Sequence, residues 1–532
     1  MSESFGTAVI GSGPSGWACA RALVARGVRV TVLDVGEKLP AERQAAVEAL
    51  KWRKPAEWDA DIVRLVRENP TVHTRPIPRK LSFGSDYVYG QGRAFAPTAG
   101  PVDEMSFTFA CGGLSTVWGG AMLPTAEGDM VEWPFGRAAL DDAYAAVLNA
   151  LPLSAAHDGL EAAFPLYREP GCTVPLSPPS RRMMDRFRRN SDRLAAKGIV
   201  AGMARLAVTA EAQGDVAGCD GCGLCLSGCP RGAIWNSGVD IEAMHRAGTL
   251  RYRSGVVVTR FSEDEGGAEL ALLDPASGEV RSERFDRVFV ACGSINTARL
   301  TLASLNLFGQ PRRMHESQKF LVPMLRPDGD PGLFTETAFT LPNAVLVVRD
   351  DEDGHWSQVQ ISPINDLALQ KLGIRPSAPA ALKALVRPFL GRMVFGWGSI
   401  HSRYSAGIDL TLEPGNGAAP VLRVQPRDNP AFPLAYRRVV RRLLANAAPL
   451  GLLALPPLAR LSSPGSGNHY GSVFPMRADP RQIWETDLLG RPGGMQRVHL
   501  VDATVLPSIP GTTLALPTMA NAWRIGTEAP TQ

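Results

Sequence analysis

The stretch that decides the fold is Thr7-Ala-Val-Ile-Gly-Ser-Gly-Pro-Ser-Gly16, near the start of a chain of 532 residues. The apolar run Thr7–Ile10 predicts a β-strand, and Trp17 to Arg26 has the small and apolar residues of a helix that packs on a sheet. Gly27 ends that helix, and a second apolar run follows from Val28 to Leu33. These residues predict a strand–helix–strand unit with two parallel strands.

The turn in this unit has the spacing of a dinucleotide-binding site. Gly11, Gly13 and Gly16 form a G-x-G-x-x-G pattern between the strand and the helix. Glycines permit a tight turn there, and the helix N-terminus then faces a pyrophosphate. Asp34 ends the second strand and can accept hydrogen bonds from a ribose. The pattern predicts dinucleotide binding without distinguishing NAD from FAD, and a glycine-rich turn with no ligand is the alternative.

The composition is that of an ordinary folded protein. Apolar residues make up 45% and charged residues 20% of the chain, which excludes a disordered, collagenous or coiled-coil protein. The net charge of only +4 argues against nucleic-acid binding. We see neither a secretory signal nor a run of 18 apolar residues that predicts a transmembrane helix. We therefore expect a cytoplasmic protein.

Two apolar segments leave a membrane contact open. Residues 443–459 are the most apolar stretch, but Asn446 and three prolines interrupt them, and four arginines lie just upstream. Peripheral contact with a membrane surface is one interpretation, and packing inside the protein is the favoured one. Residues 380–402 are expected either to cap a substrate pocket or to touch a membrane.

Four of the eight cysteines lie close together in the expected loop 214–237. Cys219, Cys222, Cys225 and Cys229 have the C-x2-C-x2-C-x3-C spacing of a bacterial ferredoxin. Glycines between them allow thiolates from one loop to converge. The spacing predicts an iron–sulfur cluster, either [4Fe–4S] with Cys229 as fourth ligand or [3Fe–4S] with three ligands. Zinc on four thiolates and metal-free thiols are the alternatives.

Farther along the chain the apolar pattern changes to a period of two, which indicates an antiparallel sheet with one wet face. A helix is expected at Ser294–Ser304, and Gly415-Asn-Gly417 predicts a hairpin connection. The fold class is therefore α/β, with a Rossmann-like domain and a second α+β domain built on an antiparallel sheet. Strands of the second domain are expected at 334–349, 355–362, 407–413 and 421–425. Further strands are expected before the helix Ser294–Ser304, at 255–261, 268–273 and 287–292.

Several segments together resemble a known family. Val498 to Gly526 is similar to the C-terminal signature of the glucose–methanol–choline (GMC) oxidoreductases, which are FAD enzymes. Cys111–Gly120 and Ala291–Ser304 resemble the two internal signatures of that family. Asn468–Met476 resembles the stretch that bears its catalytic histidine. With the N-terminal unit, five blocks follow the order of the family.

The resemblance implies a bound FAD and the residues that hold it. Trp-Gly-Gly at 118–120 is similar to the sugar-dehydrogenase-like branch, so a sugar, a polyol or another alcohol is the expected substrate. By this resemblance, the pyrophosphate contacts Gly11, Gly13 and Gly16, the adenosine ribose contacts Asp34, and the adenine contacts Val258. The flavin end contacts Ser115, Trp118 and Gly119, and the ribityl–pyrophosphate region contacts Asp502. Thr513 occupies the active-site position where the family usually has a second His or Asn.

Alcohol oxidation by a flavin needs a base for the hydroxyl proton and a carbinol hydrogen that faces flavin N5. His469 is the candidate base, because the pKa of histidine lies near neutral, and a histidine that serves packing is the alternative. Thr513 cannot act as a base, so Asn468 or His401 is expected to assist. Because Thr513 replaces the usual His or Asn of the family, a second interpretation is a reductase or isomerase. A third is a flavin and iron–sulfur electron carrier without a substrate of its own.

The expected domains are discontinuous. The FAD-binding domain comprises 1–50, 90–130, 200–310 and 460–532, and the substrate domain comprises 51–89, 131–199 and 311–459. If the cysteine run holds a cluster, electrons leave the flavin through it to an external acceptor. This exit favours a dehydrogenase over an oxidase.

Overall fold

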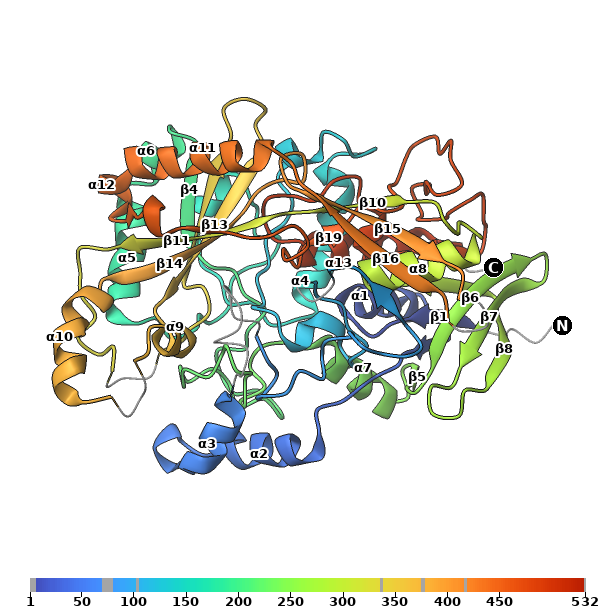
Figure 1. Ribbon diagram of the computed structural model, residues 1–532, viewed down its shortest axis with the longest axis horizontal. Helices are drawn as coiled ribbons and strands as arrows, with labels where there is room; N and C mark the ends of the chain where they lie inside the picture. Colours follow the sequence, from blue (N-terminus) through green and yellow to red (C-terminus); the bar gives the residue numbers. More distant parts are fainter. Residues whose placement is uncertain are drawn as a thin grey trace.

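The computed structural model describes residues 6–68, 80–101, 105–334, 338–374, 378–415 and 419–530. Figure 1 shows short parallel strands, their helices and further antiparallel strands on the right, and a separate sheet of long antiparallel strands on the left. Within the described ranges, no helix has both the length and the apolar character needed to span a membrane. The α/β architecture predicted from the sequence is confirmed.

The N-terminal βαβ unit forms the centre of a five-stranded parallel sheet. In β1 (Thr7–Ile10) every residue is buried, and Ile10 pairs with Leu33 on one side and with Val290 on the other. The central strand β1 is therefore enclosed on both faces, as expected within a parallel sheet that helices cover. From edge to edge the order is β20 (Val498–Leu500), β9 (Arg287–Val290), β1, β2 (Val30–Leu33) and β5 (Arg251–Arg253).

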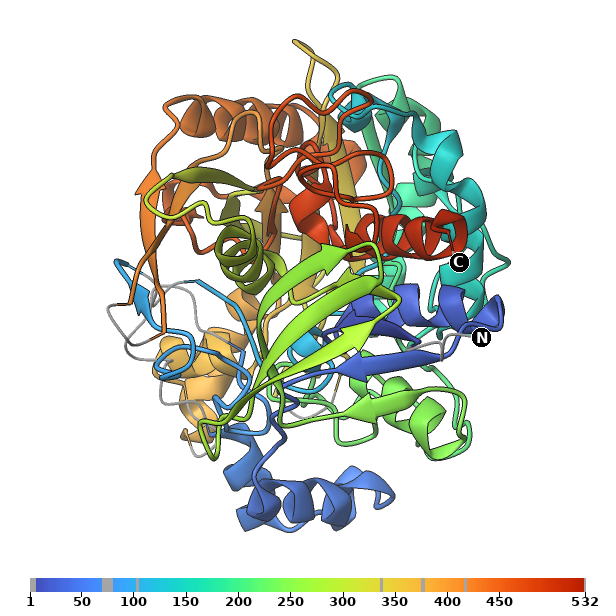
Figure 2. The ribbon, with the colours of Figure 1, turned by 90° about the vertical axis from the view of Figure 1, so that its right-hand side faces the viewer.

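Two helices from opposite ends of the chain pack side by side on this sheet: α1 (Pro14–Ala25) and α13 (Ala515–Glu528) (Figure 2). Gly526 permits the close approach, because a Cβ there would lie 3.0 Å from the carbonyl oxygen of Cys19. Arg26 extends the contact and donates to the carbonyls of Gly526 and Ala529, both at 2.8 Å. The packing joins the C-terminal segment to the dinucleotide-binding unit.

The second part of the molecule contains the antiparallel sheet that the period-two pattern predicts. Its strands β12 and β13 pair from Ala344↔Ile361 to Arg349↔Trp356. The strand expected over 334–349 begins only at Ala344, and residues 335–337 lie outside the described ranges. The order is β17 (Leu453–Ala454), β11 (Lys319–Leu325), β14 (Met393–Ser399), β13 (Trp356–Pro363), β12 (Ala344–Arg349) and β4 (Ile199–Met203), with β18 (Arg460–Leu461) also on β11.

A further sheet links the two parts. The predicted pairing of 407–413 with 421–425 is confirmed by the register Glu413↔Val421, while the predicted hairpin turn falls partly on residues 416–418, outside the described ranges. The order is β19 (Tyr470–Gly471), β10 (Arg312–Glu316), β15 (Gly407–Glu413), β16 (Val421–Arg427) and β3 (Thr98–Ala99).

A three-stranded sheet lies beside the parallel sheet and is formed by β6 (Val257–Asp264), β7 (Gly267–Leu273) and β8 (Val280–Phe285). Helix α8 spans Ser294–Ser304, the bounds expected from the sequence. Its last residue, Ser304, accepts the backbone N–H of Phe261 at 2.9 Å and so ties the helix to β6.

The apolar segment 443–459 is partly buried. Leu443 and Leu450 lie in the core, whereas Leu444 and Leu453 are exposed. The segment 380–402 contains an exposed helix and the interior strand β14. The remaining helices are α2 (Ala41–Lys51), α3 (Ala60–Arg67), α4 (Asp141–Asn149), α5 (Pro178–Arg189), α6 (Ser191–Ala195), α7 (Ser237–Arg246), α9 (Asp366–Lys371), α10 (Ala380–Leu390), α11 (Ala431–Ala445) and α12 (Ala447–Leu450).

The predicted division into two discontinuous domains stays a prediction. Strand β4 crosses the expected boundary at residue 200 and pairs with β12 in the antiparallel sheet. Strand β3, expected in the FAD-binding domain, pairs with β16. Strand pairing thus connects segments that the sequence division separates.

Candidate active site

A cavity of about 1120 Å³ lies at the carboxyl ends of the parallel strands. Gly11 follows β1, Asp34 follows β2 and Ala291 follows β9, and all three line it. This edge of a parallel sheet is where α/β proteins bind ligands. The cavity continues into the antiparallel part, where Lys319 and Trp397 also line it. One space therefore connects the dinucleotide turn with the second sheet.

The glycine turn has the geometry that its spacing predicts. Gly11 has φ of +103°, and a Cβ there would lie 2.5 Å from the carbonyl oxygen of Ala291. Gly13 is the N-cap of α1 and offers no side-chain cap, so the N–H groups of the first turn stay available to an anion. Gly11 and Gly13 line the cavity. Gly16 does not; it packs against the turn, where a Cβ would lie 2.0 Å from the carbonyl oxygen of Gly11.

Asp34 lies in the cavity wall and is held by two hydroxyl groups. The hydroxyl of Ser12 donates to its carboxylate, as does that of Tyr252 at 3.3 Å. Burial raises the pKa of Asp34 to about 6, and these hydrogen bonds oppose the increase. Ser12 also accepts the backbone N–H of Gly112 at 2.8 Å. The acid of the βαβ unit is thereby connected to the second glycine-rich loop.

That second loop brings Ser115, Trp118 and Gly119, the residues expected at the flavin end, to the cavity. Ser115 is buried and accepts the backbone N–H of Ser237 at 3.1 Å. The indole N–H of Trp118 donates to the carbonyl of Trp235 at 2.8 Å, and the two rings lie 5.7 Å apart. These contacts attach the loop to the segment that contains Trp235 and Ser237.

Val258 and Asp502, the other two predicted cofactor residues from the sheets, also line the cavity. Asp502 accepts the N–H of Gly293 at 2.9 Å and the hydroxyl of Thr504 at 2.7 Å. Its carboxylate thus joins the start of α8 to the end of β20. Val258 lies at an irregularity of β6, where the register with β7 shifts.

His469 lines the same cavity. Asn468, which precedes it, also lines the cavity and has φ of +60°. The carbonyl of His469 accepts the N–H of Ser317 at 3.0 Å, which fixes the loop against β10. Within the described structure its buried Nδ1 has no hydrogen-bond partner. Burial, with a further contribution from the charge of Lys319, lowers the pKa of His469 well below its ordinary value.

Two residues expected to take part do not line the cavity. The hydroxyl of Thr513 accepts the N–H of Leu123 at 3.0 Å and donates to its carbonyl at 3.1 Å. It therefore lies in the wall, bonded to the backbone. His401 stacks on His355 with ring centroids 3.9 Å apart, and neither belongs to the cavity lining.

His401 belongs instead to a separate buried cluster with His355 and Asp129. Within the described ranges these three alone bring three possible metal ligands within 4.8 Å of one another. However, Nδ1 of His401 accepts the N–H of Arg403 at 3.2 Å. The ring proton of neutral His401 then lies on Nε2, the atom that a metal would need. We assign no ligand to this cluster.

The four cysteines of the run do not form such a close set. Cys219, Cys225 and Cys229 pack into one apolar cluster, and Cys222 packs into a neighbouring one beside α2 and α3. No three of their sulfur atoms lie within 4.8 Å of one another. Burial raises the pKa of the Cys219 thiol to about 12 and also raises that of Cys229. The thiols are thus farther apart than ligands of one tetrahedral ion.

Sequence reasoning missed two lysines that line the cavity, Lys80 and Lys319. Burial lowers the pKa of each to about 8. The ammonium of Lys80 donates to the carbonyl of Trp118 at 2.9 Å and lies within the electrostatic range of Cys225 and Cys229. Neither lysine belongs to a motif, so no local signal distinguishes them.

Comparisons with known proteins agree with this geometry. A family model of NAD(P)-binding Rossmann-like domains matches residues 9–40. No curated protein sequence matches the chain significantly. The structure is similar to a solved structure of pyridoxine 4-oxidase from Mesorbium loti, with a TM-score of 0.57 and 14% identity over 98% of both chains. This likeness confirms the GMC-type fold that the sequence resemblance implies.

Proposed function

We propose that the protein is an FAD-dependent oxidoreductase that oxidises a C–OH group of a sugar, a polyol or another alcohol. The observation that supports this most is the continuity of one cavity. Gly11, Asp34 and His469 all line it. A cofactor bound along the glycine turn would therefore share its cavity with the imidazole.

The residues present fit FAD. The cavity of about 1120 Å³ exceeds the range of roughly 300–1,000 Å³ usual for small-molecule pockets, which leaves room for a dinucleotide and a substrate. The uncapped N-terminus of α1 suits a pyrophosphate, and Asp34 suits a ribose. Ser115, Trp118 and Gly119 form the wall that would surround the flavin end. When bound, FAD supplies the acceptor for the hydride.

His469 has the properties of the base that such an oxidation requires. Its lowered pKa keeps the imidazole neutral at physiological pH, so it can accept the proton of a substrate hydroxyl. Because Nδ1 is buried within the described structure, a substrate can reach the imidazole only at Nε2. Asn468, which also lines the cavity, is the nearest polar side chain in sequence and is proposed to orient that hydroxyl.

The fold relative supports the reaction class. Pyridoxine 4-oxidase, by its name, oxidises pyridoxine, and its fold covers 98% of this chain. At 14% identity the likeness says nothing about the substrate here. The choice of a sugar or polyol depends on the resemblance of residues 118–120.

We further propose that Cys219, Cys222, Cys225 and Cys229 hold an iron–sulfur cluster, which would supply one-electron transfer. The ferredoxin-like spacing of these four cysteines in the sequence supports a cluster rather than zinc. Backbone N–H groups of the loop approach the sulfurs of Cys219, Cys222 and Cys229, as is usual around such clusters. Lys80 connects this loop with the flavin wall at Trp118. The arrangement favours a dehydrogenase with an external acceptor.

One experiment separates this function from its two alternatives. FAD-loaded protein is mixed without air with a panel of alcohols and, after chemical reduction, with the matching carbonyl compounds. Bleaching of the flavin by an alcohol supports the proposed direction. Reoxidation by a carbonyl compound without bleaching by any alcohol would indicate a reductase. Reaction with neither would indicate an electron carrier.

A further inference from the structure

Two cations lie at the end of the cavity beside His469. Lys319 on β11 and Arg460 on β18 both line it, and these strands pair with Leu321 opposite Arg460. Ser462 reinforces the pairing: its N–H donates to the carbonyl of Lys319 at 2.9 Å, and its hydroxyl accepts the N–H of Lys319 at 3.0 Å. The strand pairing therefore fixes the backbone positions of Lys319 and Arg460 relative to each other.

The ammonium of Lys319 has no ion-pair or hydrogen-bond partner in the described structure. The acid whose charge acts on it is Glu316. That carboxylate is fully buried and accepts the N–H of Gly465 at 2.9 Å instead of forming a salt bridge. Lys319 lines the cavity with a partly buried side chain, so its ammonium is available to a ligand there. A negatively charged ligand would supply the missing partner.

The carboxylates that line the cavity do not come from the strands that carry Lys319 and Arg460. Asp34 and Asp502 are the only carboxylates among its described lining residues, and both follow strands of the parallel sheet. Among residues 460–469, the polar side chains that line the cavity are those of Arg460, three serines, Asn468 and His469. Lys319 and Arg460 therefore give this part of the lining positive charge, while Glu316 is buried outside the lining.

We propose that the substrate is an alcohol that carries an anionic group, a carboxylate or a phosphate, close to the carbon that is oxidised, and that Lys319 binds this group. The inference rests on the proposed function, because it takes His469 as the base. Lys319 is near enough to His469 for its charge to act on the imidazole. An anion on Lys319 thus lies beside the hydroxyl that His469 deprotonates. Arg460 provides a second positive charge at this end.

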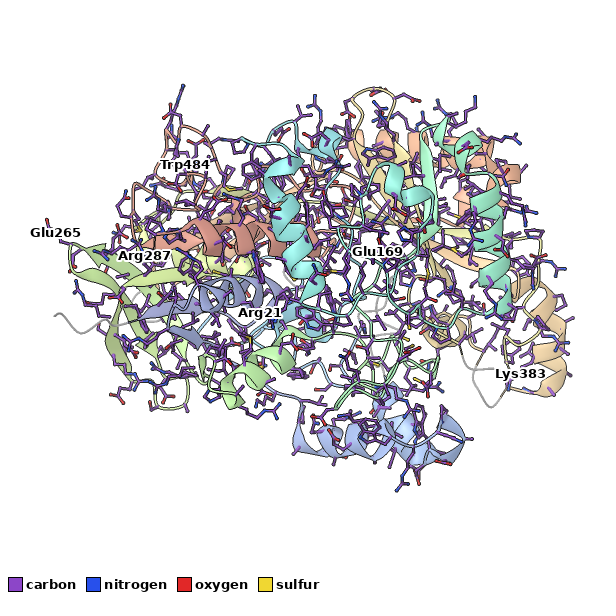
Figure 3. The ribbon with its side chains drawn as sticks, turned by 180° about the vertical axis from the view of Figure 1, so that it is seen from behind. Arg21, Glu169, Glu265, Arg287, Lys383 and Trp484 are labelled. Atoms are coloured by element: carbon purple, nitrogen blue, oxygen red, sulfur yellow. The ribbon has the colours of Figure 1, made fainter. Side chains whose placement is uncertain are left out.

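The test uses FAD-loaded protein and small probes without stereochemistry. Glycolate and ethylene glycol differ only in a carboxylate that replaces a CH2OH group, and inorganic phosphate is the third probe. Binding or reduction is followed by the flavin absorbance without air. The variants are Lys319→Met, Lys319→Arg and the control Lys383→Met on α10, which lies at the edge of the molecule (Figure 3) and contributes no residue to the cavity lining. Retained flavin absorbance and an unchanged thermal midpoint show that each variant is folded.

We expect an anion to bind the wild type roughly tenfold more tightly than ethylene glycol, and Lys319→Met to remove that difference. Lys319→Arg and Lys383→Met are expected to keep it. Glycolate or phosphate, whichever binds, identifies the anionic group. Raising the pH to about 9.5 is expected to weaken binding in the wild type but not in Lys319→Arg, because arginine stays charged. Glu316 and His469, the other titratable groups here, change charge at lower pH.

Three results would overturn this proposal: absence of binding by both anions, equal affinity for ethylene glycol, or unchanged anion binding in Lys319→Met. A Lys319→Met variant with an altered flavin spectrum and unchanged anion binding would assign the lysine to the flavin. Failure of the proposed function would give results that differ from failure of this inference. If neutral alcohols bleach the flavin through His469 regardless of Lys319, only the substrate class is wrong. If His469→Ala leaves bleaching unchanged, the assignment of the base is wrong.

Discussion

The backbone N–H of Ser317 donates to the carbonyl of His469 at 3.0 Å. Next to this bond, Glu316 pairs with Tyr470 as β10 meets β19. Two segments far apart in the sequence are therefore held in one register, and Lys319 follows two residues after Ser317. The positions of the proposed base and of the proposed anion-binding lysine depend on the same few backbone hydrogen bonds.

Replacing His469 tests the proposed base. We expect His469→Ala to lower the rate of flavin reduction by an active alcohol about 10²–10⁴-fold, the usual contribution of a general base. The flavin should stay bound, because the imidazole is not placed among the residues that hold the dinucleotide. Stopped-flow absorbance measures the rate. The matched control is His157→Ala at an exposed histidine, whose rate should equal that of the wild type. An equal rate in His469→Ala would refute the assignment.

Replacing Cys225 tests the proposed cluster. Protein purified without air is expected to contain iron and acid-labile sulfide, and Cys225→Ser should lose most of both, because each thiolate ligand is needed to hold a cluster. Cys172→Ser is the control, since that cysteine is exposed and lies outside the run. Wild-type protein without iron, or with zinc in its place, would contradict the prediction.

Glu316 gives a prediction for stability against pH. Burial raises its pKa to about 7. A raised carboxyl pKa means that the unfolded chain releases this proton more readily, so ionisation opposes folding as pH rises from about 4.5 to 7. Glu316→Gln removes this cost and should stabilise the protein at pH 8 by about 3 kcal/mol, an order-of-magnitude value. At about pH 4 the two proteins should be equally stable.

Thermal unfolding midpoints at these two pH values provide the measurement for Glu316→Gln. Glutamine keeps an oxygen that can accept the N–H of Gly465, so the hydrogen bond of Glu316 Oε1 is preserved. A midpoint at pH 8 that is equal to or below that of the wild type would contradict the cost assigned to the Glu316 anion.

The contact between α1 and α13 is sensitive to added volume. A Cβ at Gly526 would already lie 3.0 Å from both the carbonyl oxygen of Cys19 and the Cβ of Ala22. Gly526→Val should therefore destabilise the protein by about 1–3 kcal/mol, the range for overpacked cores. Denaturant unfolding measures the change. Gly171→Val, at an exposed glycine with no atom closer than 3.8 Å, should be neutral, and an equal loss in both variants would contradict the packing argument.

Local patterns predicted the dinucleotide half of the site well. The glycine spacing and the short apolar runs are properties of consecutive residues, so β1, α1 and β2 could be located, and helix α8 has the bounds that were predicted. The same holds for the alternation that revealed β15 and β16. These elements depend on periodicity rather than on distant contacts.

The rest of the site depends on contacts between distant segments. Lys319 is a single lysine at the start of a strand, and only the pairing of β11 with β14 and β18 brings it to the cavity. Thr513 was expected to face the active site, but both polar groups of Leu123 bind its hydroxyl. The sequence pattern contains no signal for either arrangement.

The most direct test of the central claim is a crystal structure of the protein with FAD bound. The account predicts the pyrophosphate at Gly11 and Gly13, the ribose at Asp34, and the isoalloxazine between Trp118 and His469, with space for a substrate beside the imidazole. An isoalloxazine placed outside this cavity, or a ring with His469 beyond reach of its reacting face, would contradict the account.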